Sequence, residues 1–173
     1  MEKQVVIQSF SPIICLVSVT EAPEIRTEFL GGYDEKKPES WERFLKWGTL
    51  IAIDQGQPYA VETSFAADAT HLYTGTKRGG RMNRCLEKNP AASFKLCDGD
   101  RRGHNYRAAI IESRAEILTG REDILYCLKI IFTKLGVATD NIESKADTFA
   151  AGKGSLSLYR LPLNKIGGIA SGK

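Results

Sequence analysis

The sequence predicts a mainly β domain: six largely antiparallel strands that close into a small barrel, with helices at its periphery. Apolar and β-branched runs recur along the chain, at 49–54, 59–67, 71–76, 91–97, 106–118 and 155–163. Several are joined by connections of hairpin length, such as the turn at 55–58, and short connections favour antiparallel pairing. Few helical segments are expected, so closure into a barrel accounts best for how the sheet buries its apolar face.

The chain of 173 residues is long enough for one domain with its own core, and its 42% hydrophobic and 26% charged residues are typical of globular proteins. A polar junction at 31–40 separates two parts. We therefore expect an N-terminal arm of unknown role at 1–35 and the main domain at 36–173. The apolar start is broken by polar residues and Pro12, so it predicts a strand or extended arm rather than a secretory segment. No run reaches the roughly 18–20 apolar residues that a membrane span needs.

Three helices are expected. A short one starts near Pro38, carries an apolar face and ends near Gly48. The second covers 81–88, since Met82, Cys85 and Leu86 share one face and Pro90 prevents continuation. The third covers 120–135, with a capping box at Thr119 and Glu122 and a stop at Gly136. Residues 137–152 are expected to be irregular.

Charge and cysteine content limit the classes of partner. The net charge of +3 is too small to indicate a nucleic-acid partner. A weaker hypothesis is a nucleic-acid-binding protein that uses Arg101, Arg102, His104 and Tyr106. We expect neither a nucleic-acid nor a membrane partner. The four cysteines are widely spaced, which argues against zinc. Cys85 and Cys127 fit free core thiols, so a reducing, cytoplasmic location is expected.

Common catalytic motifs are missing. The terminal GGIASGK imitates a phosphate-binding P-loop, but no Ser or Thr follows its lysine, and GKGS at 152–155 lacks the upstream glycine. Neither Ser64 nor Ser113 lies in a G-x-S-x-G elbow. With only two histidines, a metal site is not expected, and no catalytic residue is identified.

The segment 74–82 carries the strongest chemical signal, because it is expected to be a loop that can surround a phosphate. Thr74 and Thr76 offer hydroxyl donors, and three glycines let backbone N–H groups approach an anion closely. The charge comes from Lys77, Arg78 and Arg81, and Arg81 starts a helix whose N-terminus also favours anions. The alternative is a mobile basic loop that binds nothing, and composition alone does not separate the two.

Four stretches, taken in order, resemble the flavin-binding split barrels related to pyridoxamine 5'-phosphate oxidase, and most of all the branch that includes nitroimidazole reductases. They are TLIAIDQGQPYAVETSFAAD, LYTGTKRGGRMNRCLEKNPAASFKL, YRAAIIESRAEIL and the helix that follows. The resemblance covers about residues 40–135 well and the last strand loosely. Residues 1–35 are not covered.

The resemblance implies a homodimer with FMN in two clefts at the subunit interface. Glu62, Thr63 and Ser64 match the segment along the isoalloxazine ring, and Thr74, Gly75 and Thr76 match the segment at its edge and the ribityl chain. Arg81 matches a phosphate ligand. Two positions depart from the pattern: Met82 replaces a second basic residue, for which Lys77 or Arg78 could substitute, and Gly75 replaces a histidine of the nitroimidazole-reductase branch.

The resemblance therefore implies an FMN-dependent oxidoreductase with a small-molecule substrate and an electron donor that the sequence does not identify. The missing histidine keeps an alternative open, in which the barrel holds FMN, haem or another cofactor without catalysis, as an electron carrier or sensor. The match at 62–64 and 74–82 is what both readings share.

Overall fold

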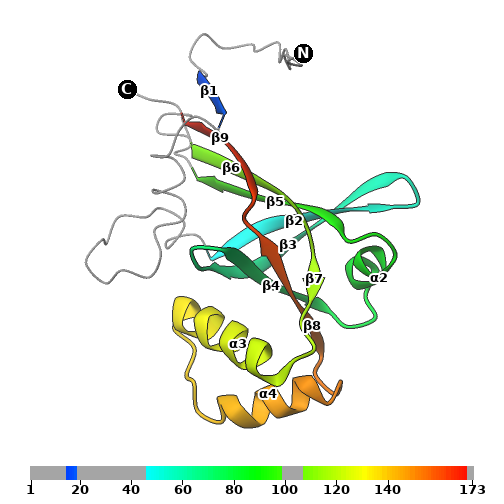
Figure 1. Ribbon diagram of the computed structural model, residues 1–173, viewed down its shortest axis with the longest axis vertical. Coiled ribbons are helices and arrows are strands. Elements are labelled where there is room, and N and C mark those ends of the chain that lie inside the picture. The colour runs from blue at the N-terminus through cyan, green and yellow to red at the C-terminus, as the bar shows by residue number, and fades with distance from the viewer. Residues whose placement is uncertain (1–14, 19–45, 99–106, 171–173) are drawn as a thin grey trace.

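The computed structural model describes residues 15–18, 46–98 and 107–170 (Figure 1). Within them lie nine strands and three helices: β1 (Cys15–Ser18), β2 (Trp47–Asp54), β3 (Gln57–Ala67), β4 (His71–Lys77), α2 (Arg81–Lys88), β5 (Ala91–Asp98), β6 (Arg107–Arg114), β7 (Glu116–Ile117), α3 (Arg121–Leu135), α4 (Ile142–Ala150), β8 (Leu156–Pro162) and β9 (Lys165–Ala170). The expected mainly β architecture is confirmed.

Every strand pairing is antiparallel, in the order β1-β9-β6-β5-β2-β3-β4-β8-β7. Two interrupted segments, β6–β7 and β8–β9, connect the halves of the sheet. The segment β6–β7 pairs with β9 before its break at Ala115 and with β8 after it, while β8 and β9 are separated by a break at residues 163–164. The Ser113 hydroxyl donates to the carbonyl oxygen of Pro162, 2.8 Å away, where the two interrupted segments meet. The sheet consequently curls back on itself.

Alternation along the strands places one core inside the curl and a second core outside it. The inner core contains large side chains that solvent does not reach: Leu50, Phe65, Leu72, Phe94, Ile111 and Leu161. The outer core lies between the β3–β4–β8 part of the sheet and the helices, where Ala66, Tyr73 and Leu158 pack against α3 and α4. Figure 1 shows α3 and α4 stacked on each other, with α2 apart from them at the side of the barrel.

The predicted count of six strands was wrong. The fifth predicted strand, 106–118, is interrupted and forms β6 and β7, and the last, 155–163, is followed by β9. Strand β1 forms within the segment expected to be an arm. The glycine-rich β9 has too few side chains to show alternation, so no strand was predicted there. Its Gly167 and Gly168 pair with β6, so the described residues 167–170 of the P-loop-like segment lie in a strand.

Three local expectations also need correction. Helix α3 begins after Gly120 and its N-cap has no side-chain hydrogen bond, so the predicted capping box does not form. The segment expected to be irregular contains α4, whose apolar contacts Ile142 and Ala146 are too sparse for a clear periodic pattern. Strand β2 begins at Trp47, earlier than predicted, while the helix expected near Pro38 and the basic residues at 101–106 lie outside the described residues.

Candidate functional site

The predicted anion-binding loop is a tight turn of three residues, 78–80, rather than a loop over 74–82. Strand β4 continues through Lys77, and α2 begins at Arg81. Gly79 has a φ of 66°, in the left-handed region, and the Gly80 N–H donates to the Lys77 carbonyl oxygen at 2.9 Å. A Cβ on Gly80 would lie 2.9 Å from that same oxygen. The turn therefore requires both glycines.

Helix α2 presents a free N-terminus at this turn. Its N-cap, Gly80, has no side chain to pair with the amides of the first turn, and that turn contains no acidic residue. The first helical hydrogen bond runs from the Arg84 N–H to the Gly80 carbonyl oxygen. The positive end of the helix dipole and the amides ahead of Arg84 thus have no side-chain cap from the N-cap residue.

The cations at the turn have different partners. The Arg81 Nε lies 2.7 Å from Asp54 Oδ2, and its guanidinium carbon lies 4.1 Å from the centre of the Tyr59 ring. The hydrogen bond with Asp54 raises the pKa of Arg81, so this residue stays charged, and its side chain remains half exposed. Lys77 is exposed and forms no ion pair with the described residues. Lys77 and Arg81 therefore supply accessible positive charge, and Arg84, which is also exposed, donates a hydrogen bond from Nη1 to the Gly79 carbonyl oxygen.

Arg78 has a structural role in this arrangement. Its Nε donates to the carbonyl oxygen of Gly154 at 2.9 Å, its Nη2 donates to that of Leu156 at 3.3 Å, and its backbone N–H donates to that of Ser155 at 3.0 Å. The guanidinium therefore fastens the turn to the start of β8. This leaves less of its donor capacity for a ligand than the sequence suggested.

The threonine hydroxyls predicted to face the ligand point into the barrel. Thr74 is fully buried, and its hydroxyl donates to the Ser64 carbonyl oxygen at 2.8 Å. The Thr63 hydroxyl donates to the Gly75 carbonyl oxygen at 2.8 Å. Thr76 Oγ1 is buried and has no hydrogen-bond partner in the described part of the chain. Strand β4 extends beyond the predicted loop boundary, so its in–out alternation turns Thr74 and Thr76 inward.

The other predicted site residues divide between the two faces. Glu62 and Ser64 lie on the outer face with Trp47 and Thr49, and Glu62 Oε1 accepts a hydrogen bond from the Thr49 hydroxyl at 2.5 Å. Gly75 is half-buried on β4. Met82 is buried in the inner core, so its side chain packs between α2 and the barrel interior rather than facing the turn.

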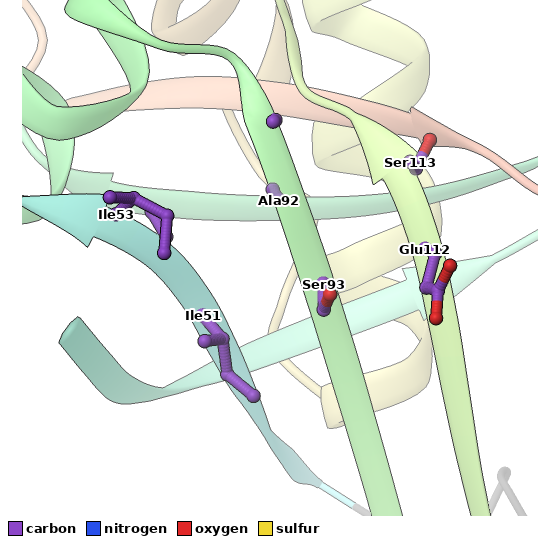
Figure 2. A pocket seen from close by; sticks show the side chains of 8 residues that line it. Ile51, Ile53, Ala92, Ser93, Glu112 and Ser113 are labelled. Carbon is purple, nitrogen blue, oxygen red and sulfur yellow. The ribbon is translucent and has the colours of Figure 1, made fainter. Parts of the chain in front are cut away.

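A shallow hollow of about 270 Å³ lies on the sheet, over β2, β5 and β6 and away from the β4–α2 turn. Figure 2 shows Ile51 and Ile53 on one side of it and Ser93 and Glu112 on the neighbouring strands. Large apolar side chains are exposed around this part of the sheet: Trp47 at 62%, Ile53 at 41% and Ile110 at 43%. In the described chain no helix covers this face, whereas α3 and α4 cover the other part of the sheet.

Sequence reasoning missed two features of the site. Asp54 and Tyr59 flank the β2–β3 hairpin turn, yet they contact Arg81, and nothing in their spacing signals that contact. The bond from the Tyr159 hydroxyl to Asn83 joins β8 to α2 across 76 positions of the sequence. Both contacts come from the closure of the barrel, which brings α2 against β2 and β8.

The described residues contain no helix long and apolar enough to cross a membrane. They also contain no group of three or more His, Cys, Asp or Glu side chains arranged to hold a metal ion.

Similar structures are known, although no protein-family model and no curated protein matches the sequence significantly. A provisionally assigned 5-nitroimidazole antibiotic resistance protein from Bacteroides thetaiotaomicron aligns with a TM-score of 0.64, 14% identity, and coverage of 98% of this chain and 95% of its own. An FAD and heme binding protein from Mycobacterium smegmatis aligns with a TM-score of 0.58 and 12% identity, over 87% of this chain and 72% of its own. A provisionally assigned pyridoxamine 5'-phosphate oxidase from Corynebacterium glutamicum aligns with a TM-score of 0.55 and 14% identity, over 95% of this chain and 100% of its own.

The chain has the fold of the flavin-binding split barrels. The resemblance noted in the sequence is confirmed at the level of the fold, which is what structural likeness at such low identity establishes. Any ligand of this chain has to be argued from its own residues.

Proposed function

We propose that two copies of this chain bind FMN between them and use it as an oxidoreductase cofactor for a small-molecule substrate. The observation that carries the proposal is the uncapped N-terminus of α2, which follows the Gly79–Gly80 turn and lies beside Arg81 and Lys77. It supports the proposal because it occurs on a fold shared with proteins described as binding FAD.

The turn fits the phosphate end of FMN. A phosphate carries up to two negative charges and several acceptor oxygens, and it is favoured by free helix amides together with cationic side chains. Arg81 can offer the guanidinium nitrogens that do not contact Asp54, and Lys77 offers an ammonium with no described ion pair. Asp54 orients Arg81, while the Tyr59 ring supports its flat face.

The neighbouring outer face fits the ring end. Glu62 and Ser64 on β3 and Gly75 on β4 provide strand segments with small or polar side chains, and Gly75 adds no side chain over the surface. A Cβ at Gly75 would lie 3.2 Å from Leu158 Cδ2, so the backbone there is already close to its neighbours. In this arrangement Thr63 and Thr74 contribute by fixing the backbone of β3 and β4, and Met82 contributes by packing under α2.

A second copy of the chain would supply the other wall of the ring site. The exposed apolar side chains of Trp47, Ile53 and Ile110 lie on a face that no described helix covers. Trp47 pairs in register with Ser64, so this face is continuous with the proposed ring site. Burial of such a face between two subunits is favourable, and it would also exclude water from the flavin.

The flavin would supply the electron and hydride transfer, and the residues of this chain would bind it, orient it and set its polarity. Arg81 and Lys77 would bind the negatively charged phosphate at one end of the FMN molecule. The Glu62 carboxylate, which accepts a hydrogen bond from Thr49, would lie on the ring side. Among the described residues, the Asp54 carboxylate is paired with Arg81 and the Glu62 carboxylate accepts a hydrogen bond from Thr49, so neither is assigned to proton transfer and the catalytic residues are left unassigned.

A second candidate is a non-catalytic flavin or haem protein that serves as a carrier or sensor. It is supported by the similar fold of the FAD and heme binding protein and by the glycine at position 75, where the resemblance to nitroimidazole reductases would place a histidine. Sustained oxidation of a nicotinamide donor with a nitro or quinone acceptor would favour the enzyme over the carrier.

The test is an absorption spectrum of the freshly purified protein, followed by titration of the flavin-free protein with FMN. The proposal expects the visible bands of oxidised flavin and saturable binding of one FMN per chain. A colourless protein that does not bind added FMN contradicts it. Visible bands of haem without flavin would support the haem form of the second candidate.

A further inference from the structure

The buried polar side chains of the described residues gather at one end of the barrel interior, beside α2. Five residues make up this set: Thr63, Thr74, Thr76, Asn83 and Ser157. Strand register extends the group, since Thr74 is opposite Tyr159 and Thr76 is opposite Ser157 on β8. Buried polar groups need partners to offset the loss of water, so their concentration under one short helix requires an explanation.

Tyr159 connects this polar group to the helix. Its side chain is almost completely buried, and its hydroxyl donates to Asn83 Oδ1 at 3.1 Å. Asn83 Nδ2 in turn donates to Glu87 Oε1 at 2.6 Å, one helical turn further on. Burial raises the pKa of Tyr159 to about 12, so its hydroxyl keeps its proton and remains a donor at neutral pH.

The bond from Tyr159 is directional, whereas the other contacts of α2 with the barrel interior are not. Met82, Cys85 and Leu86 place the apolar side of the helix on the inner core, and such contacts tolerate small rotations and shifts. A hydrogen bond weakens steeply when its angle changes. Because Asn83 lies in the first turn of α2, its bond restrains the same turn that carries Arg81 and the uncapped amides.

We propose that Tyr159 is a positioning residue for the anion site: through Asn83 it orients the first turn of α2 toward a phosphate group. This inference rests on the proposed function for the identity of the ligand. Tyr159 lies inside the barrel and does not touch the ligand, but in this proposal it contributes to the affinity for the phosphate end of FMN.

The test compares Tyr159→Phe with Tyr73→Phe, a matched control. Each change removes one tyrosine hydroxyl that donates to a side chain, but the Tyr73 hydroxyl donates to Asp68 at 3.0 Å, in the β3–β4 connection rather than at α2. For Tyr159→Phe we expect the Kd for FMN to rise about three- to tenfold, the effect of one misaligned neutral hydrogen bond. The Kd of Tyr73→Phe should equal that of the wild type.

Riboflavin, which has the same ring but no phosphate, separates positioning from a general loss of structure. Tyr159→Phe should leave the Kd for riboflavin unchanged, so the ratio of riboflavin to FMN dissociation constants should fall. Equal weakening of both ligands would indicate damage to the barrel and overturn the proposal. Asn83→Leu removes the same bond from the helix side and should reproduce the change in ratio.

Hydrogen exchange of the protein without flavin gives a second readout. Tyr159→Phe should accelerate exchange of the Arg84 and Asn89 amides, which donate to Gly80 and Cys85 carbonyl oxygens, and leave the α3 amides unchanged. Wild-type protection in α2 would overturn the proposal. If the wild-type protein binds no FMN, the proposed function fails instead, and the exchange comparison alone decides whether Tyr159 orders α2.

Discussion

The outer surface of this barrel consists of two regions that are built alike but covered differently. On β3, β4 and β8, side chains such as Ala66, Tyr73 and Leu158 are buried under α3 and α4. On β2 and β6, outward side chains such as Ile53 and Ile110 are large, apolar and exposed. The same alternation produces both faces, but the described chain supplies a cover for only one of them.

The difference suggests that the two faces have separate roles, one in the stability of the chain and the other in association. The covered face stabilises the folded chain, because its apolar area is removed from water by the chain's own helices. The uncovered face contributes little to the stability of a single chain, and it becomes favourable only when another surface packs on it. The predicted ring-facing positions Glu62 and Ser64 lie beside this second face, which links the proposed dimer to the proposed flavin site.

The largest expected effect is on the covered face. Leu128→Ala, in α3, should lower the free energy of unfolding by about 2–5 kcal/mol, because it removes a buried side chain and leaves a cavity. Chemical denaturation measures this change. The matched control is Ile53→Ala on the uncovered face, measured at a concentration where the protein is monomeric, and it should cost less than about 1 kcal/mol. Equal losses at the two sites would remove the distinction between the faces.

The next effect concerns the anion site at the end of β4. Arg81→Ala should raise the Kd for FMN by about ten- to a hundredfold, since it removes a charge-assisted hydrogen bond to the phosphate. Lys88→Ala is the control, because Lys88 carries the same charge in the last turn of the same helix. A Kd that changes equally in both variants would mean that only the overall charge matters, and an unchanged Kd for Arg81→Ala would exclude it as a ligand.

A smaller effect is expected on self-association. Here Ile53→Ala is the test variant and Leu128→Ala is its control. Ile53→Ala should weaken the dimer by about tenfold, since it removes apolar area from the proposed interface. Leu128→Ala should leave the association constant unchanged as long as the protein stays folded. Sedimentation equilibrium provides both values. Dimerisation that is insensitive to Ile53 would assign the interface to a different surface.

The smallest effect concerns the connection that fastens the covered face. Partial burial alone would raise the pKa of Asp68, but hydrogen bonds from the Thr70 and His71 backbone, and from the Thr70 and Tyr73 hydroxyls, outweigh it and lower the pKa. The stabilisation from ionised Asp68 is therefore complete above its ordinary value of 3.8 and lost as the pH falls through the lower folded value. Because Asp68 is only partly buried, solvent screens these interactions, and we expect them to stabilise the fold by under about 1 kcal/mol.

Asp68→Asn checks this expectation. The difference in unfolding free energy between the wild type and the variant should be constant from neutral pH down to about pH 5 and should shrink at more acid values. Urea denaturation over this range measures it. A difference that grows as the pH falls would reverse the assigned sign.

Much of the fold was predictable from the sequence because it depends on local patterns. Alternation located β2 to β6 and β8, Pro90 marked the end of α2, and Gly136, with a φ of 66°, ends α3 as expected. The strand β9 and helix α4 were missed because their sequences, KIGGIA and IESKADTFA, carry few apolar side chains and are stabilised by what they pack against. Closure into a barrel was predicted from the small number of helices, but local patterns could not show where the strands are interrupted, at Ala115 and at residues 163–164.

The site was predictable in part. The glycines and cations of the β4–α2 segment were recognisable from composition, but the inward direction of Thr74 and Thr76 depended on where β4 ends. The contacts of Arg81 with Asp54 and of Tyr159 with Asn83 join residues 27 and 76 positions apart, so no spacing rule could reveal them. The resemblance to flavin-binding split barrels supplied the fold context that composition alone lacked.

Sedimentation velocity of FMN-loaded protein, monitored in the visible absorption of the flavin, tests most directly whether the uncovered face and the β4–α2 turn form one site between two copies. We predict that the protein-bound flavin sediments entirely with a species of twice the mass of one chain. Bound flavin that sediments with a single chain, or a dimer that carries none, would contradict the account.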